Sequence, residues 1–343
     1  MNLNKNIFEE SKIKIENKIN EILDNEINKY KDNEFIKESL NELKRLSSGG
    51  KRVRGYLVKV GQLLFDINND DYVDIAAALE IFQTAILIHD DIIDEADTRR
   101  GMETINSKYK GHLGISRGIC IGDLGYFLSY KIISESNIDS SIKEEIMKIY
   151  ATTLYNTVVG EIIDVELPLK SIEFHKDMSD KNIYDIYENK TAWYTIIGPI
   201  LIGAALAKAS DEDKKKIIEA GTNLGIAFQI KDDLLGLYSD ITTMGKTLND
   251  IKEGKQTVIY KYALDKASKE DIEIIKKYYG NLNLDIDGNK KIIELFDNLG
   301  AKQNAEKLVE EYTNKGISVI ESSNFKNKEV FIDFANYLLK REN

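Results

Sequence analysis

Only two prolines, Pro168 and Pro199, occur in a chain of 343 residues, so the backbone can stay helical over most of its length. Apolar residues recur at spacings of three and four, as in IKIENKINEILDNEINKY near the start, which is the period of an amphipathic helix. Three further segments are apolar on nearly all sides, as expected of buried helices: 75–93, 194–209 and 221–235. The pattern predicts an all-α fold, with residues 1–343 in a single large helical bundle.

The charge of the chain argues against one large class of partners. Lys and Arg total 47 against 58 Asp and Glu, a net charge of −11, and the two signs are interleaved, which disfavours nucleic-acid binding.

The N-terminal segment is charged throughout, and the longest apolar run, 196–207, is shorter than the roughly 20 residues that a spanning helix needs. The single cysteine, Cys120, excludes an internal disulfide and is expected to pack as a small buried side chain. We therefore expect a cytoplasmic protein without a transmembrane segment.

The segment HDDIIDEADTRR, residues 89–100, places five acids at the end of an apolar stretch. If residues 76–94 form one helix, Asp90 and Asp94 share a face one turn apart, and Asp91 lies about 100° around the axis. Carboxylates at this end repel one another and oppose the negative end of the helix dipole, so a positive charge must offset them. For an isolated acidic run, a solvated helix end is the alternative explanation.

A second segment, FQIKDDLLG, repeats this arrangement: an apolar helix ends in Asp232 and Asp233, and the following loop supplies lysines. Two such helix ends are difficult to explain by solvation. If they converge, their carboxylates would surround a cavity rich in the oxygen ligands that Mg²⁺ prefers together with substrate phosphates. Cations would bind the phosphate oxygens, although each basic cluster alone would be ordinary surface charge. These cations are Lys51, Arg52, Arg54, Arg99, Arg100, Lys190, Lys246 and Lys255.

Other phosphate and metal sites fit the sequence less well. The GKT at 245–247 lacks the first glycine of a P-loop, because Asp240 holds that position. His89 precedes Asp90, as in metal-dependent phosphohydrolases, but only His112 and His175 follow it, which makes a multi-histidine site implausible. The Glu-x-x-His pairs of a di-iron bundle are absent from the sequence. We expect His89 to line or border the site.

Together the motifs resemble those of the trans-isoprenyl diphosphate synthases, the polyprenyl synthetase family. The resemblance covers nearly the whole chain, because separated motifs occur in the family's order: GGKRVRG, HDDIIDEADTRRG, GEIIDVELP, KTAWYT, FQIKDDLLG and GKTLNDIKEGKQT. It implies the isoprenoid synthase type I fold, a helical bundle around a deep central cavity, in which isopentenyl diphosphate condenses with an allylic diphosphate. The implied cofactor is Mg²⁺, with three ions when substrate is bound, and the implied assembly is a homodimer.

The resemblance also implies a role for each matching position. The Mg²⁺ ions that bridge the allylic diphosphate would be held by Asp90, Asp91, Asp94, Asp232 and Asp233. The contacts to isopentenyl diphosphate would be Lys51, Arg54, Gln83 and Arg100. The contacts to the allylic diphosphate would be Arg99, Lys190, Lys246 and Lys255, with Thr191 and Gln229 beside the developing cation.

The reaction that the resemblance implies accounts for the arrangement of charges. Ionisation of the allylic substrate leaves negative charge on diphosphate, stabilised by metals and cations, and a carbocation that needs a dry cavity with oxygen dipoles. The isopentenyl double bond then attacks this carbocation. Diphosphate is the expected base for the final proton loss, so no histidine or glutamate base is required.

Two positions depart from the family's pattern. The second aspartate motif normally ends in Asp, but Gly236 holds that place here. Glu161 stands where Gln is usual, while Asp164 matches the pattern. We expect Glu161 and Asp164 to support the metal site, and we expect activity to be retained because Asp232 is the main ligand of the second motif.

The helix that carries Asp90 should set the product length, because the growing tail is expected to run toward its N-terminus. Farnesyl-producing relatives carry aromatic residues four and five positions before the first aspartate, where this chain has Ile86 and Ala85. Phe82 lies one turn deeper, and a turn of about 5.4 Å is comparable with one isoprene unit. We therefore expect a C20 product, geranylgeranyl diphosphate, and we expect Ala85→Phe to shorten it.

Alternatives remain open at this point. If Phe82 instead only packs within the bundle, it does not limit the product, and products of C25–C35 are possible. On the facing wall, Tyr126, Phe127 and Tyr130 would either stop the chain or point elsewhere. A terpene cyclase on the same fold is disfavoured because every residue expected to bind isopentenyl diphosphate is present. A regulatory subunit is disfavoured because the first aspartate motif is complete.

Overall fold

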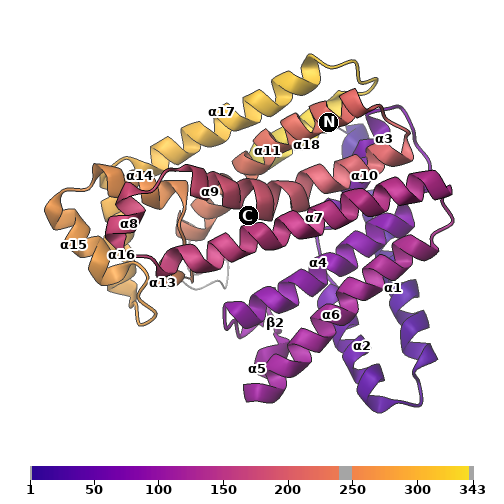
Figure 1. Ribbon diagram of the computed structural model, residues 1–343, viewed down its shortest axis with the longest axis horizontal. Helices are drawn as coiled ribbons and strands as arrows, with labels where there is room; N and C mark the ends of the chain where they lie inside the picture. Colours follow the sequence, from indigo (N-terminus) through magenta and orange to yellow (C-terminus); the bar gives the residue numbers. More distant parts are fainter. Residues whose placement is uncertain (1, 239–248, 340–343) are drawn as a thin grey trace. The chain divides into compact units, whose positions relative to one another are not determined.

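The computed structural model describes residues 2–238 and 249–339, and most of them are helical (Figure 1). The only strands among these residues are two short ones, β1 (Thr98–Arg99) and β2 (Met102–Glu103). The prediction of an all-α fold is confirmed. The chain divides into two compact units, the first comprising Met1–Ile149 and Pro199–Ala209 and the second comprising Tyr150–Gly198 and Ser210–Asn343. That these units act as one domain stays a prediction.

The first unit is organised around α4, which packs against α1, α2, α3 and α6. Its helices are α1 (Asn2–Lys29), α2 (Glu34–Ser47), α3 (Val53–Leu63), α4 (Val73–Ile93), α5 (Ile105–Tyr109), α6 (Gly111–Glu135), most of α10 (Gly198–Leu206) and the first part of α7 (Ser140–Glu166). Helix α4 is buried because it is apolar on nearly all sides, as the sequence indicated. It begins three residues before the predicted helix, and Asp94 forms its C-cap rather than its last turn.

Helices α4 and α6 pack closely because α6 presents glycines to α4. A Cβ atom on Gly122 would lie 2.2 Å from Nε2 of His89, and one on Gly125 would lie 2.9 Å from Cβ of Ala85. Any larger residue at these two positions would push the helices apart. The His89 ring therefore lies directly on α6, where its Nε2 is 3.1 Å from the carbonyl oxygen of Ile119.

The second unit is organised around α11 (Asp211–Tyr238), which packs against η2 and runs alongside α17 (Figure 1). Its other elements are the end of α7, η1 (Leu167–Leu169), α8 (Ile172–Asp177), α9 (Lys181–Ile186), η2 (Tyr187–Ile197), α13 (Asn249–Glu253), α14 (Val258–Lys266), α15 (Lys269–Tyr278), α16 (Ile286–Asn298), α17 (Ala301–Glu321) and α18 (Glu329–Leu339). Element η2 is a π-helix, a form that is rare and often found at functional sites.

The segment 98–114 forms the β1–β2 hairpin, α5 and the start of α6. One expectation about local structure is wrong. Cys120 is exposed on α6 rather than buried, because it lies on the side of α6 that does not pack against α4.

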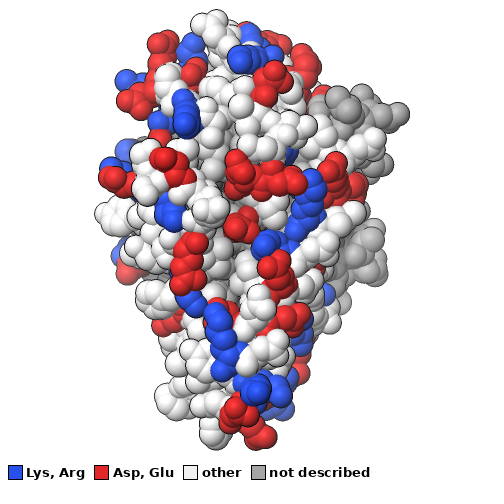
Figure 2. Space-filling view, turned by 90° about the vertical axis from the view of Figure 1, so that its right-hand side faces the viewer, with Lys and Arg blue, Asp and Glu red and all other residues white. Residues whose placement is uncertain are grey.

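The surface agrees with the interleaved charges of the sequence. Figure 2 shows acidic and basic side chains alternating across one face, with no broad area of a single sign. None of the helices within 2–238 and 249–339 combines the length and the apolar character needed to cross a bilayer.

Candidate active site

The acidic end of α4 carries its own positive charge. Nη2 of Arg99 donates to Oδ2 of Asp90 at 2.7 Å, and its Nε donates to Oδ1 of Asp91 at 2.5 Å. Asp91 is only 2% exposed, and this burial raises its pKa to about 6 although Arg99 acts in the opposite direction. Asp94 is half-buried beside them. Arg99 is thus the positive charge that the sequence required at this helix end.

The β1–β2 hairpin directs Arg99 back onto α4. Arg99 pairs with Met102 across the hairpin, and Arg100 and Gly101 form the two-residue turn. Both turn residues have positive φ, 53° and 74°, as a type I′ turn requires. Non-glycine residues such as Arg100 rarely adopt this conformation, so its presence at the turn indicates a constraint on this segment.

Arginines from separate elements of the first unit gather beside Gly50. A Cβ atom on Gly50 would lie 2.8 Å from Nη1 of Arg52 and 3.5 Å from Nη1 of Arg100. Partial desolvation of its guanidinium lowers the pKa of Arg100 although Glu80 acts in the opposite direction, and Arg99, Arg54 and Arg52 lower it further. The structure therefore brings predicted contacts to isopentenyl diphosphate near one another in this unit. Lys51, from the same segment as Arg52 and Arg54, is exposed.

Arg100 and Arg99 also line a small cavity of about 10 Å³ together with Asp91 and Thr84. Gln83, the remaining predicted contact to isopentenyl diphosphate, is 8% exposed and precedes Thr84 on α4. The end of α4 therefore carries metal-binding and phosphate-binding candidates on adjoining faces.

Arg52 differs from the other cations of its segment. It is 2% exposed and forms ion pairs with Glu16 at 2.5 Å and with Glu80 at 3.5 Å. The Arg99 side chain, which is also paired with two carboxylates, is 23% exposed, but the Arg52 guanidinium is closed off from solvent and is therefore not available to a phosphate. The expectation that Arg52 binds substrate is therefore wrong, because burial gives it a structural role.

Among the predicted chain-length residues, Phe82 and Ile86 are four positions apart and share a face of α4, whereas Ala85 lies on another. Ala85 faces Gly125 of α6, whereas Ile86 is half-buried. Phe82 is 1% exposed, and its ring centroid lies 5.4 Å from that of Tyr126 on α6. On the same helix, Phe127 and Tyr130 are 73% and 53% exposed in the chain and therefore point away from this ring pair.

In the second unit, Asp233 lies within a buried hydrogen-bond network. The hydroxyl of Tyr187 donates to one carboxylate oxygen, and Nε2 of Gln229 donates to the other at 2.8 Å. The hydroxyl of Thr191 donates to Oε1 of Gln229 at 2.5 Å. Burial raises the pKa of Asp233 to about 8, although these hydrogen bonds act in the opposite direction. Asp232 is half-buried and precedes this network on α11.

The lysines predicted to contact the allylic diphosphate pair with acids from the GEIIDVELP motif. Nζ of Lys190 lies 2.6 Å from Asp164 and 2.7 Å from Glu161, and Nζ of Lys255 lies 3.2 Å from Asp164. Burial alone would raise the pKa of Asp164, but the two lysines outweigh it and the pKa is lowered. Gly160 permits this approach, since a Cβ atom there would lie 2.3 Å from the backbone nitrogen of Lys190. The other predicted lysine, Lys246, lies outside the described residues.

Gly236, the departure in the second aspartate motif, lies against another acid. A Cβ atom on Gly236 would be 2.1 Å from Oδ2 of Asp250 on α13. Asp250 therefore brings a carboxylate to the place where the side chain of the fifth motif residue would begin. The sequence contained this residue in the GKTLNDIKEGKQT motif, but only the fold reveals its position.

The donor set fits Mg²⁺ bound together with a diphosphate. Within the part of the chain that the structure describes, no group of three acidic, histidine or cysteine side chains is placed to hold a metal ion by itself. Helices α4 and α11 instead each carry a few carboxylates. Mg²⁺ is typically held in this way, with water and substrate phosphates completing its coordination.

Several residues of these networks were not identified from the sequence: Glu16, Glu80, Tyr187, Asp250 and Glu253. All of them except Glu253, which pairs with Lys255 two residues away, contact residues distant in sequence. Tyr187 offered one signal, because it lies three residues before Lys190 at the start of the KTAWYT motif.

The chain is similar to known proteins in family, sequence and structure. A family model described as polyprenyl synthetase matches residues 34–296. The chain is 32% identical over 238 residues to the geranylgeranyl diphosphate synthase of Sulfolobus acidocaldarius, covering 68% of this chain and 69% of that protein. It is 31% identical over 253 residues to the short chain isoprenyl diphosphate synthase of Methanocaldococcus jannaschii, covering 73% of each.

A solved structure is similar over nearly the full length. It is the geranylgeranyl pyrophosphate synthase from Corynebacterium glutamicum, complexed with isoprenyl diphosphate and magnesium. The TM-score is 0.86 at 26% identity, over 95% of this chain and 97% of that one.

Proposed function

Because the chain belongs to the polyprenyl synthetase family and is a trans-prenyl diphosphate synthase, we propose that it makes geranylgeranyl diphosphate from isopentenyl diphosphate and an allylic diphosphate. The observation that carries this proposal is the end of α4, where Asp90, Asp91 and Arg99 are joined by hydrogen bonds. Arg100 of the same hairpin adds a cation from the isopentenyl diphosphate set. One helix end thus supplies groups for both substrates.

We propose that the metal-binding aspartates are Asp90, Asp91 and Asp94 in the first unit and Asp232 and Asp233 in the second. These aspartates would hold Mg²⁺, three ions in the substrate complex, with Asp233 acting mainly through its buried hydrogen bonds. Bound Mg²⁺ would stabilise the negative charge that develops on the leaving diphosphate.

The cations would change partners when substrate binds. Arg99, Lys190 and Lys255 pair with carboxylates here, and they would donate instead to oxygens of the allylic diphosphate. Lys246 is assigned to the same diphosphate by its motif. Glu161 and Asp164 would support the metal site by keeping the lysines in place.

The other polar groups would act at the carbon centres. Thr191 and Gln229, already joined by a hydrogen bond, would direct oxygen dipoles at the allylic carbocation. Lys51, Arg54, Gln83 and Arg100 would hold isopentenyl diphosphate so that its double bond attacks that carbocation. The released diphosphate would take the final proton.

The ring pair of Phe82 and Tyr126 supports a C20 product. Ala85 and Ile86 supply no aromatic floor at the level of a farnesyl product, whereas Phe82 lies two helical turns from Asp90, about 12 Å along the axis. Because Tyr126 contacts both Phe82 and, at 5.1 Å between centroids, His89, its ring lies along this stretch of α4. We propose that the two rings form the floor of the product cavity. If these two rings did not close the cavity, the products would instead be the longer C25–C35 prenyl diphosphates.

We propose that the protein is a cytoplasmic homodimer. An apolar face of α6 is exposed in the single chain, with Ile119, Phe127 and Tyr130 at 45%, 73% and 53%. A second copy would cover this face, as apolar areas of this kind commonly mark interfaces. Phe127→Asp should then give monomers in sedimentation, whereas Ile13→Asp, which changes an exposed residue of α1, should not.

The proposed activity is tested by incubating the protein with Mg²⁺, isopentenyl diphosphate and each of the C5, C10 and C15 allylic primers. Dephosphorylated products are then separated by chromatography. A linear C20 alcohol is expected, and it should be absent when Mg²⁺ is removed by chelation. Cyclic hydrocarbons formed without isopentenyl diphosphate would instead indicate a terpene cyclase.

A further inference from the structure

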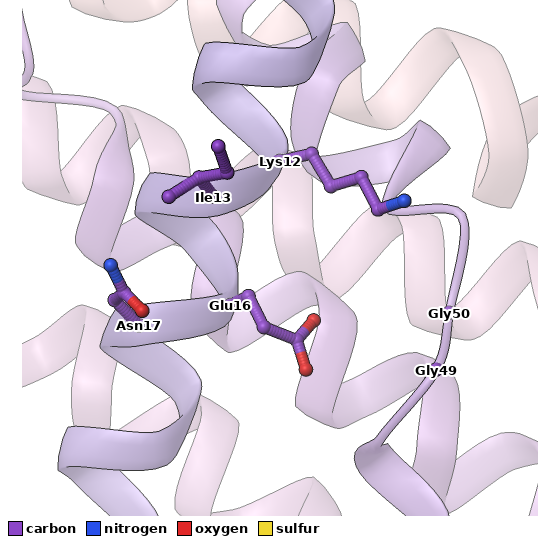
Figure 3. A pocket seen from close by; sticks show the side chains of 6 residues that line it. All are labelled: Lys12, Ile13, Glu16, Asn17, Gly49 and Gly50. Carbon is purple, nitrogen blue, oxygen red and sulfur yellow. The ribbon is translucent and has the colours of Figure 1, made fainter.

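Helix α1 lies outside the residues matched by the family model, 34–296, yet it extends side chains toward the GGKRVRG segment. Figure 3 shows Lys12 and Glu16 reaching from α1 toward Gly49 and Gly50. A cavity of about 290 Å³ is lined by these residues together with Ile13 and Asn17. Helix α1 is therefore a neighbour of the segment that carries Lys51 and Arg54.

Glu16 holds this segment through the side chain of Arg52. Nε of Arg52 donates to Oε2 of Glu16 at 2.6 Å, and Nη2 lies 2.5 Å from the same oxygen. Nη2 also donates to the carbonyl oxygen of Ser47 at 2.5 Å, and Nη1 lies 3.5 Å from Glu80. The guanidinium is thus fixed by contacts from α1, α2 and α4.

The backbone at Arg52 depends on these contacts. Arg52 adopts φ 57°, a left-handed conformation that is unfavourable for residues other than glycine, and it forms the N-cap of α3. Glu80 continues the network by accepting a hydrogen bond from the backbone nitrogen of Gly55 at 2.8 Å. The two carboxylates therefore fix both ends of the turn on which Lys51 and Arg54 lie.

Glu16 is not required to dock α1 itself. Ile15, Ile19 and Leu23 of α1 are at most 2% exposed and supply its apolar contact with the unit. The side chain of Glu16, by contrast, is 33% exposed and directs its carboxylate at Arg52. Its contribution is therefore to the position of the segment rather than to burial of the helix.

We propose that Glu16 is a positioning residue for isopentenyl diphosphate, which through Arg52 fixes the turn that presents Lys51 and Arg54 beside Arg100. The inference rests on the proposed function, which assigns Lys51, Arg54 and Arg100 to that substrate. It gives α1 a part in substrate binding that its position outside the matched residues does not indicate.

The test compares substrate binding and kinetics of Glu16→Gln with those of the wild-type protein. Loss of a charged hydrogen bond should raise both the Kd and the KM for isopentenyl diphosphate on the order of tenfold. The KM for the allylic substrate and kcat at saturation should stay within about twofold, since Glu16 touches neither the aspartates nor Arg99. Glu16→Asp, which keeps the charge, should recover part of the affinity.

Glu21→Gln is the matched control, because Glu21 lies on the same helix and pairs at 3.0 Å with Lys18 of α1 itself. It should change the affinity for neither substrate. Equal losses for both substrates, or unchanged affinity in Glu16→Gln, would overturn the positioning role. If the wild-type protein binds no isopentenyl diphosphate in calorimetry, the proposed function fails as well, so the two failures are distinguishable.

Discussion

Replacing Phe82 by alanine should lengthen the product by one isoprene unit. The ring is 1% exposed and packs on Tyr126 with 5.4 Å between centroids, so its removal opens the proposed floor. The next side chain on that face of α4 is Ala78, about 6 Å further along the axis, which is room for one unit. The main product should therefore shift from C20 to C25. Loss of a buried ring should also lower the free energy of unfolding by about 3–5 kcal/mol.

The assay measures the chain length of dephosphorylated products made from isopentenyl diphosphate and the C15 primer, at a temperature below the thermal midpoint of each variant. Tyr126→Ala should lengthen the product in the same direction, because it removes the other ring of the pair. Tyr130→Ala is the matched control, since Tyr130 is 53% exposed on the same helix and should leave the product unchanged. A folded, active Phe82→Ala variant that still makes only C20 would refute the reasoning and assign Phe82 to bundle packing.

Three further predictions concern the acids, the upper part of the product cavity and pH. Asp90→Ala and Asp232→Ala should each reduce turnover at least about 100-fold while circular dichroism stays unchanged, since both side chains are half-buried polar groups outside the apolar core. Ile86→Phe should shorten the product toward C15, which chromatography would detect, because Ile86 is half-buried one turn nearer to Asp90. The His175 ring is 4% exposed, with Nδ1 at 3.1 Å from the hydroxyl of Tyr260, and burial lowers its pKa. The unfolded chain then binds this proton more tightly, so stability should fall as pH drops below about 6.5, by at most about 1.4 kcal/mol per pH unit. In urea unfolding, the free energy of unfolding of His175→Phe should depend less on pH than that of the wild-type protein. An unchanged dependence would show that His175 is not its source.

The helices and the acidic motifs were predictable from the sequence because their signals are local. The helical period and the scarcity of proline indicate the helices, and the paired acids after an apolar run place Asp90 in the last turn of α4. The same reasoning is wrong for Asp232, because α11 continues for six residues beyond it, to Tyr238. The need for a nearby positive charge was also predictable, because it follows from repulsion among neighbouring carboxylates. Its source, Arg99, became clear only from the hairpin that turns the chain back onto α4.

The choice of face on a buried helix was not predictable. A helix that is apolar on all sides gives no signal of which residue meets which neighbour. Ala85 faces Gly125 of α6, so a ring in Ala85→Phe would meet that helix, and Ile86 is the better position for shortening the product. The structural role of Arg52 was not predictable either, because the two acids that pair with it come from α1 and α4, which are distant from it in the sequence.

In both units, cations assigned to the allylic diphosphate are already engaged by acids. Arg99 is held by Asp90 and Asp91, and Lys190 and Lys255 are held by Asp164. A diphosphate arriving without metal would have to separate these ion pairs and leave carboxylates beside its own negative charge. Mg²⁺ held by the carboxylates of the α4 end would free Arg99 from its partners there, so that Arg99 could donate to a phosphate oxygen. We therefore expect the binding of metal and the binding of substrate to be coupled, because each would supply the charge partner that the other removes.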